Sequence, residues 1–223
     1  MTAWNVGWWK KGAAIPWGLN GGQRNEIVEF PHGGNFDNLP MPDGSSGDAW
    51  LCQADGSGQG AGGWNSGIIA PLDPDKTYRF MIPIATLGSG TRTSYWGTSN
   101  VCDINTTTEN GNPYFAYIGN LTPNKWHLFV GYLFPRNSAG KTHAGAGVWD
   151  MATGIKIADG WNYCFRPDGF QPSHRAYQFY ATNGAYQAFG RPIIELVDGS
   201  EAPVFAALAA SKSATNAQAR ISD

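Results

Sequence analysis

The segment 126–134, WHLFVGYLF, constrains the fold more than any other part of the chain. Its residues alternate and are rich in aromatic and β-branched types, which is typical of a half-buried β-strand. Pro135 cannot donate a hydrogen bond to a neighbouring strand, so we expect the strand to end there. A glycine-rich turn follows, and residues 146–150 have the pattern of a second short strand. Together these segments predict a core hairpin with a long loop.

Similar short patterns recur along the chain and are separated by turn residues. The segments predicted as further strands are 26–30, 49–54, 77–84, 92–98, 114–118, 155–158, 175–181 and 187–197. Pro192 places the last of these at an edge or a bulge, and the polar or glycine-rich segments 54–67, 101–113 and 159–173 are expected to be loops. With 30 glycines, 14 prolines and no repeat of fixed period, the pattern predicts an all-β, antiparallel jelly-roll β-sandwich.

The two ends of the chain differ from this pattern. Residues 1–45 form an aromatic and glycine-rich segment, and its first 25 residues hold four tryptophans that need a surface to pack against, which indicates an attachment or oligomer contact. The sandwich is expected over residues 46–208. Ser200 as an N-cap, Pro203 and an alanine-rich run predict a short C-terminal helix, followed by a tail over residues 209–223.

Charge and cysteine content exclude several classes of protein. The net charge of −2 and the lack of basic clusters argue against nucleic-acid binding. No apolar run is long enough to span a bilayer, and residues 1–17 lack the pattern of a signal peptide. Cys52, Cys102 and Cys164 match no zinc pattern, so we expect buried free thiols, with one disulfide left open.

Seven short blocks, in order, resemble a family of β-sandwich domains found in fibres and spikes of phages and phage-like particles and in carbohydrate-binding modules. The resemblance covers roughly residues 45–208, and most of the matched residues determine the fold. The blocks are GGWN (62–65), LDPDKTYRF (72–80), NPYF (112–115), NKWHLFVGYLFP (124–135), GAGVWDMATG (145–154), HRAYQFY (174–180) and RPIIELVDGSEAP (191–203).

The resemblance implies a jelly roll that displays a sugar-binding face at the tip of an appendage. It implies a non-catalytic receptor-binding protein, made in the bacterial cytoplasm and placed on the particle surface. Its partners would be a cell-surface polysaccharide and other virion proteins, and we expect a homo-oligomer, with a trimer favoured. No cofactor is implied.

Sugar binding needs aromatic rings that stack on the apolar face of a pyranose, together with fixed polar groups for its hydroxyls. Trp64, Trp161 and Tyr163 lie in predicted loops, where a large aromatic side chain has less reason to be buried. Tyr95 and Trp96 point to opposite faces of one strand, so at most one of them faces a ligand. Core packing remains the alternative for each ring.

The candidate polar groups are His174 and Arg175, which open a strand, and Arg166. They would donate hydrogen bonds to sugar hydroxyls or to the carboxylate of an acidic sugar, for which arginine offers bidentate geometry. A structural cap or a buried hydrogen bond is the alternative role. The histidines show no metal-ligand spacing, so no metal site is predicted. A structural calcium ion stays open, with available carboxylates on Asp73, Asp75, Asp103, Asp198 and Glu201.

Two other classes of function compete with sugar binding. A glycan-degrading enzyme needs two carboxylates held about 5–10 Å apart, but Glu26 and Glu29, like Glu195 and Asp198, are three residues apart and would face opposite sides of a strand. No GxSxG nucleophile motif occurs. A structural virion component, such as a collar, decoration or fibre-base protein, would use its aromatic residues for subunit contacts.

Overall fold

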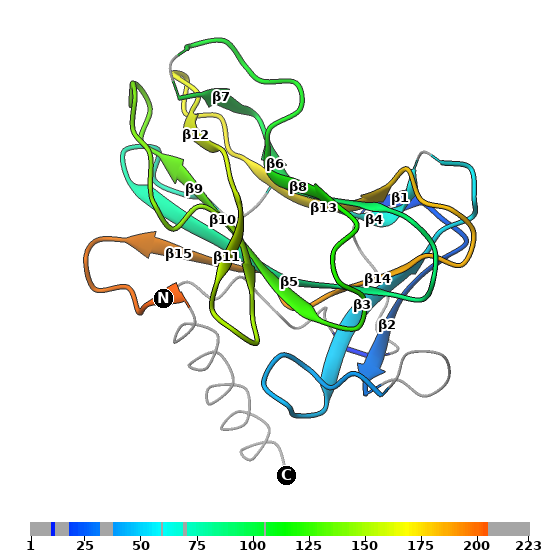
Figure 1. The fold of residues 1–223 in the computed structure, drawn as a ribbon. Coiled ribbons are helices and arrows are strands. Elements are labelled where there is room, and N and C mark those ends of the chain that lie inside the picture. Colours follow the sequence, from blue (N-terminus) through cyan, green and yellow to red (C-terminus); the bar gives the residue numbers. More distant parts are fainter. Residues whose placement is uncertain are drawn as a thin grey trace.

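A computed structural model describes residues 10–11, 18–31, 38–58, 60–68, 71–104 and 106–204 of the chain. This part of the chain is almost entirely β-structure (Figure 1). The strands are β1 (Gly18–Gly21), β2 (Arg24–Phe30), β3 (Gly47–Gln53), β4 (Ala61–Ile68), β5 (Thr77–Leu87), β6 (Thr93–Ser99), β7 (Val101–Asp103), β8 (Tyr114–Gly119), β9 (Trp126–Phe134), β10 (Gly147–Asp150), β11 (Lys156–Asp159), β12 (Asn162–Phe165), β13 (Ser173–Phe179), β14 (Tyr186–Phe189) and β15 (Ile193–Val197).

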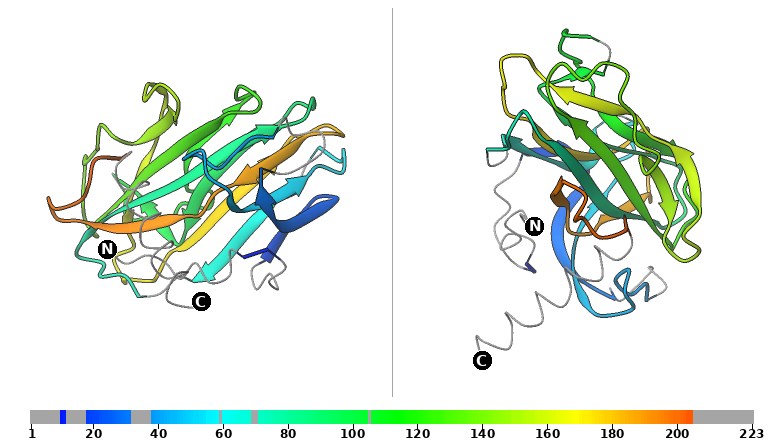
Figure 2. Two further views of the ribbon diagram at one scale, coloured as in Figure 1. Left: turned by 90° about the horizontal axis from the view of Figure 1, so that it is seen from below. Right: turned by 90° about the vertical axis from the view of Figure 1, so that its left-hand side faces the viewer.

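The strands form two packed sheets with the strand order of a jelly roll. The larger sheet contains the run β11-β10-β9-β5-β14-β3-β2, and the five-stranded sheet has the order β1-β4-β13-β6-β8. Among the central eight strands, each connection crosses from one sheet to the other except the one between β6 and β8, which are neighbours in the five-stranded sheet. This gives β3-β14-β5-β9 facing β4-β13-β6-β8. The strands of both layers lie along roughly the same axis (Figure 2, left), as in an aligned sandwich. The predicted fold class is confirmed.

The predicted core hairpin is also confirmed. Strands β9 and β10 pair antiparallel, with Val130 opposite Gly147 and His127 opposite Asp150. Every residue of β9 is buried, so the strand is covered on both faces. On its other edge β9 pairs with β5, the longest strand of the fold. This pair forms the centre of the larger sheet.

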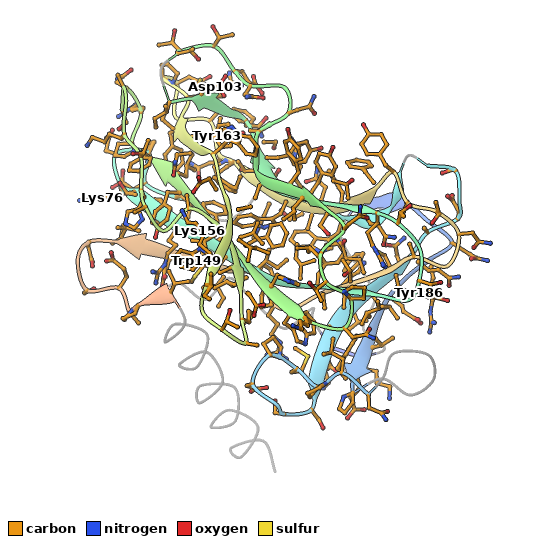
Figure 3. All side chains as sticks on the ribbon, viewed as in Figure 1. Lys76, Asp103, Trp149, Lys156, Tyr163 and Tyr186 are labelled. Atoms are coloured by element: carbon orange, nitrogen blue, oxygen red, sulfur yellow. The ribbon has the colours of Figure 1, made fainter. Side chains whose placement is uncertain are left out.

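Large aromatic side chains fill the space between the two sheets (Figure 3). Trp50, Trp64, Trp96, Phe115 and Phe129 are all almost completely inaccessible to solvent. Their rings meet edge-on or tilted: the planes of Trp96 and Phe115 are inclined by 42°, with their centroids 4.9 Å apart. This core fixes the five-stranded sheet rigidly against the larger one.

Three segments predicted as loops contain strands. Residues 54–67 include most of β4, residues 159–173 contain β12, and residues 101–113 contain β7. In β4 the glycines allow close approach of neighbouring chain segments, because a Cβ at Gly63 would lie 2.2 Å from the Ala176 carbonyl oxygen. The predicted last strand is divided into β14 and β15, with Pro192 between them.

The ends of the sandwich differ from the predicted boundaries. Strand β1 pairs with β4 and β2 pairs with β3, so the sandwich includes strands on the N-terminal side of residue 46. The predicted C-terminal helix lies almost wholly outside the described residues, which end at Val204. Ser200 and Glu201 belong to a turn, in which the Glu201 carboxylate accepts hydrogen bonds from the backbone of Asp198 and Gly199. In the described ranges no helix could cross a membrane.

Candidate functional site

The outer face of the five-stranded sheet carries a continuous group of aromatic side chains, which we call the aromatic face. Most of its rings come from β6, β8 and β13, and the others from the segments that flank β12 and β13. Its members are Tyr95, Tyr114, Tyr117, Trp161, Tyr177, Phe179 and Tyr180.

Strand alternation places these rings on the outside. In β6 Trp96 points into the core and Tyr95 points outward, and in β13 Ala176 and Tyr177 divide in the same way. Tyr95 lies directly opposite Tyr117 on β8 and opposite Tyr177 on β13. Three neighbouring strands therefore each present a tyrosine at one level of the sheet.

A row of stacked rings crosses this face. The rings of Trp161 and Tyr117 lie 5.1 Å apart with planes inclined by 13°. Tyr117 and Tyr95 repeat this geometry at 5.1 Å and 17°. Tyr180 approaches Tyr95 edge-on at 6.2 Å and ends the row on the other side. Trp161, Tyr117 and Tyr180 are 48%, 49% and 57% exposed, so the row is open to solvent.

The backbone holds Trp161 at the end of the row. Its N–H donates to the carbonyl oxygen of Phe115 on β8, at 2.8 Å. One face of the indole is stacked on Tyr117, so its exposed surface lies on the opposite face and at the ring edges. An open indole face next to a sheet surface can stack on an apolar ligand surface.

Polar groups accompany the rings. The phenol of Tyr177 lies near the side chains of Asn65 and Arg175, and the phenol of Tyr95 lies near that of Tyr180. Burial raises the pKa of Tyr95 and of Tyr177, so these phenols stay protonated near neutral pH. Each can donate and accept a hydrogen bond. The face thus combines flat apolar rings with neutral hydroxyls.

Three of the predicted ligand-contacting rings are buried, and their assignment to a binding surface is wrong. Trp64 is 0% exposed because it lies in β4 and points between the sheets. Trp96 on β6 is also 0% exposed and points between the sheets, whereas Tyr95 points outward. This agrees with the prediction that at most one of the two faces a ligand. Tyr163 lies in β12 beside Asp103 of β7 (Figure 3) and donates its hydroxyl to the Tyr114 carbonyl oxygen at 2.8 Å.

His174 is likewise a core residue and does not act together with Arg175. Its Nε2 accepts a hydrogen bond from Nε1 of Trp96 at 2.7 Å, and burial lowers its pKa to about 3. The imidazole is therefore neutral. Arg175, the next residue in the strand, points to the outer face and lies over the ring of Tyr114, with the guanidinium carbon 4.5 Å from the ring centroid.

Arg166 is occupied by structural contacts. Its guanidinium bonds to the carboxylates of Glu109 at 2.6 Å and Asp168 at 2.7 Å, and it lies over the ring of Phe170. These contacts join the loop that follows β12 to the segment between β7 and β8. Of the two roles considered for Arg166, these contacts fit the structural one, because two carboxylates already balance its charge.

The acidic residues considered for calcium serve turns and ion pairs. Asp73 accepts the backbone N–H of Asp75, while Asp75 bonds to Arg136 at 2.8 Å. Asp103 accepts from the amide of Asn110, and Asp198 accepts from Ser200. Over the described part of the chain, no group of three or more histidine, cysteine or acidic residues is placed to hold a metal ion.

The sequence prediction missed several members of the aromatic face. Tyr117 and Tyr180 are its two most exposed tyrosines, but neither was singled out. Regular alternation would place Tyr114 and Tyr117, which are three residues apart, on opposite faces of β8. The pairing of β6 with β8 is irregular, however, because its register shifts between Trp96 and Gly97. This irregularity sends both tyrosines to the outer face.

Comparison with known proteins adds a fold similarity. No family model matches the chain, and no curated protein sequence matches it. Among solved structures, an exo-beta-agarase is similar in fold, with a TM-score of 0.52 and 11% sequence identity. The similarity covers 90% of this chain and 25% of the agarase, so the chain spans about a quarter of that protein's length. At this identity the similarity shows the fold alone.

Proposed function

We propose that this protein is a non-catalytic carbohydrate-binding domain and that its aromatic face binds a polysaccharide. The observation that carries the proposal is the open row of Trp161, Tyr117, Tyr95 and Tyr180 on a rigid sheet. Exposed aromatic groups of this extent mark interaction surfaces. The agarase of similar fold is a carbohydrate-active protein, which agrees with the proposal at the level of ligand class.

The chemistry of the face suits a sugar better than a protein partner. A pyranose ring has an apolar C–H face that stacks on Trp161, and its hydroxyls need neutral donors and acceptors at fixed positions. The phenols of Tyr95, Tyr117 and Tyr180 provide both functions along the edge of the row. Because strands β6 and β8 hold Tyr95 and Tyr117, little conformational entropy of these two residues is lost when a ligand binds.

The composition of the sheet supports a non-catalytic role. Glycoside hydrolysis uses a pair of carboxyl groups that flank the scissile bond. The sequences of β1, β4, β6, β8 and β13 contain no aspartate and no glutamate. In the larger sheet the Glu195 carboxylate is buried against Arg79 in an ion pair. The aromatic face therefore binds without cleaving in our proposal.

We further propose that the domain is the receptor-binding part of a fibre or spike on a phage or phage-like particle. This step depends on the sequence resemblance described above. Several copies on one particle, such as a trimer, would bind a cell-surface polysaccharide with much higher avidity than one copy. A structural virion component remains the alternative if the face covers a subunit and binds no glycan.

Binding of the purified protein to a panel of bacterial surface polysaccharides tests the proposal. Trp161→Ala and Tyr117→Ala are expected to weaken binding at least tenfold, about 1.4 kcal/mol, with the thermal midpoint unchanged. Phe170→Ala is the matched control, because Phe170 is exposed to 45%, close to the 48% of Trp161, and lies outside the aromatic face.

Two results would count against this proposal. If the protein binds no member of the panel, or if Trp161→Ala binds as tightly as the unchanged protein, the aromatic face is not a glycan site. Release of reducing ends from a bound polysaccharide would instead show an enzyme. The three outcomes are separated by measuring binding and reducing ends on the same samples.

A further inference from the structure

Arg175 is the single charged residue in the five strands that carry the aromatic face. These strands read GLNG, AGGWNSGI, TSYWGTS, YFAYIG and SHRAYQF, with no aspartate, glutamate or lysine. His174 is neutral and points into the core. The guanidinium of Arg175 is therefore the source of positive charge on this sheet.

The sheet holds this guanidinium among the rings. Arg175 lies opposite Asn65 on one side and Gly97 on the other. The guanidinium carbon of Arg175 is 4.5 Å from the centroid of the Tyr114 ring on β8. The same carbon is 5.9 Å from the ring of Tyr177 on its own strand. Cation–π contacts of this kind orient an arginine but do not neutralise it.

The hydrogen-bonding groups of Arg175 are incompletely used. The residue is only 9% exposed, and its Nε and Nη2 atoms are buried without a hydrogen-bond acceptor in the described chain. By contrast, Arg79, Arg136 and Arg166 each pair with a carboxylate. A buried cation without a counter-ion is costly for a protein. Nε and Nη2 form the edge of the guanidinium that can bind two oxygens of one anion side by side.

We infer that the polysaccharide bound by the aromatic face is acidic and that Arg175 binds its carboxylate or sulfate group. The inference rests on the proposed function and adds the chemical class of the ligand. An anion supplies the two missing acceptors, while the exposed rings of the aromatic face contact the sugars of the same chain. Because Nε and Nη2 are covered in the free protein, the guanidinium or a stacked ring must turn toward solvent when the anion binds.

Matched pairs of polymers test the charge requirement without changing the protein. Carrageenan is measured before and after desulfation, and alginate and polygalacturonate before and after reduction of their carboxyl groups. We expect at least one charged polymer to bind about tenfold tighter than its neutral form, with a preference that weakens as salt is raised. The sulfate and carboxylate pairs show which anion is used.

Variants of Arg175 then assign the preference to this residue. Arg175→Gln is expected to abolish the difference between the charged and neutral forms, and Arg175→Lys to retain only part of it, because lysine lacks the bidentate edge. Arg136→Gln removes an equal charge from a surface ion pair and serves as the control. Thermal unfolding of each variant verifies that the fold is intact.

The outcomes separate this inference from the proposed function. Equal binding of the charged and neutral forms, with loss of both in Trp161→Ala, overturns the acidic ligand and leaves the glycan site. A charge preference that survives in Arg175→Gln also overturns the inference, because another group then binds the anion. Binding to none of these polymers overturns it as well, and failure across the wider panel removes the proposed function itself.

Discussion

At the scale of single residues, burial decides the role of each tryptophan. Trp96 and Trp161 were both candidates for ligand contact, but Trp96 is 0% exposed and Trp161 is 48% exposed. Trp96→Ala is expected to lower the free energy of unfolding by about 3–5 kcal/mol. Trp161→Ala should change it by no more than about 0.5 kcal/mol. Denaturant unfolding of both variants provides the comparison, and a large loss in Trp161→Ala would contradict the description of the face.

Stability should also fall in mild acid because of His174. Burial lowers the pKa of His174 to about 3, below its usual value of 6.5. Between these values the unfolded chain binds a proton that the folded chain does not, so the free energy of unfolding decreases as pH decreases. From pH 7 to pH 5 we expect a loss of about 2 kcal/mol from this group.

Chemical unfolding at the two pH values measures this loss. Burial also lowers the pKa of His127 and His143, so their contributions have the same sign. His174→Gln is the informative variant, because the pH dependence should become shallower even if the protein is less stable at pH 7. An unchanged slope would show that His174 is not the group responsible.

At the scale of elements, the closeness of the two sheets depends on glycine. Gly131 in β9 faces Phe115 of β8, and a Cβ there would lie 2.2 Å from the phenyl ring. Gly131→Ala is therefore expected to destabilise the protein by about 1–3 kcal/mol. Gly111 has no atom within 4 Å of its Cβ position, so Gly111→Ala should be neutral or slightly stabilising. Denaturant midpoints of the two variants test this difference.

Strands with a strong local sequence pattern were predicted correctly, and strands with a weak pattern were not. Strands β5 and β9 were predicted because alternating aromatic and branched residues are typical of β-strands. Strand β4, AGGWNSGI, reads as a loop because glycine is rare in strands, and its conformation is held by pairing with β1 and β13. Local sequence contains no information about those partners, so the error placed Trp64 on the surface.

The candidate site was less predictable than the fold for a related reason. Tyr95, Trp161 and Arg175 were identified because aromatic and arginine side chains suit sugars, and all three lie on the outer face. Which other tyrosines join them depends on the register of β6 with β8 and β13. Register over such distances in sequence is set by tertiary packing.

At the scale of the whole molecule, the interior should be closed to reagents. Cys52, Cys102 and Cys164 are all free and almost completely buried, as expected from the sequence, and burial raises the pKa of each thiol. A thiol reagent such as 5,5′-dithiobis(2-nitrobenzoate) should react with none of them in the native protein. In denaturant it should titrate 3 thiols per chain. Rapid reaction under native conditions would show that the sandwich opens locally.

The rings of the row across the five-stranded sheet follow one another at similar distances. Their centroids are separated by 5.1 Å, 5.1 Å and 6.2 Å, and the middle step, from Tyr117 to Tyr95, joins two adjacent strands. A linear glycan that crosses the strands gains one further ring for each step of this length. Affinity should therefore grow with oligosaccharide length and reach a plateau once the chain extends from Trp161 to Tyr180.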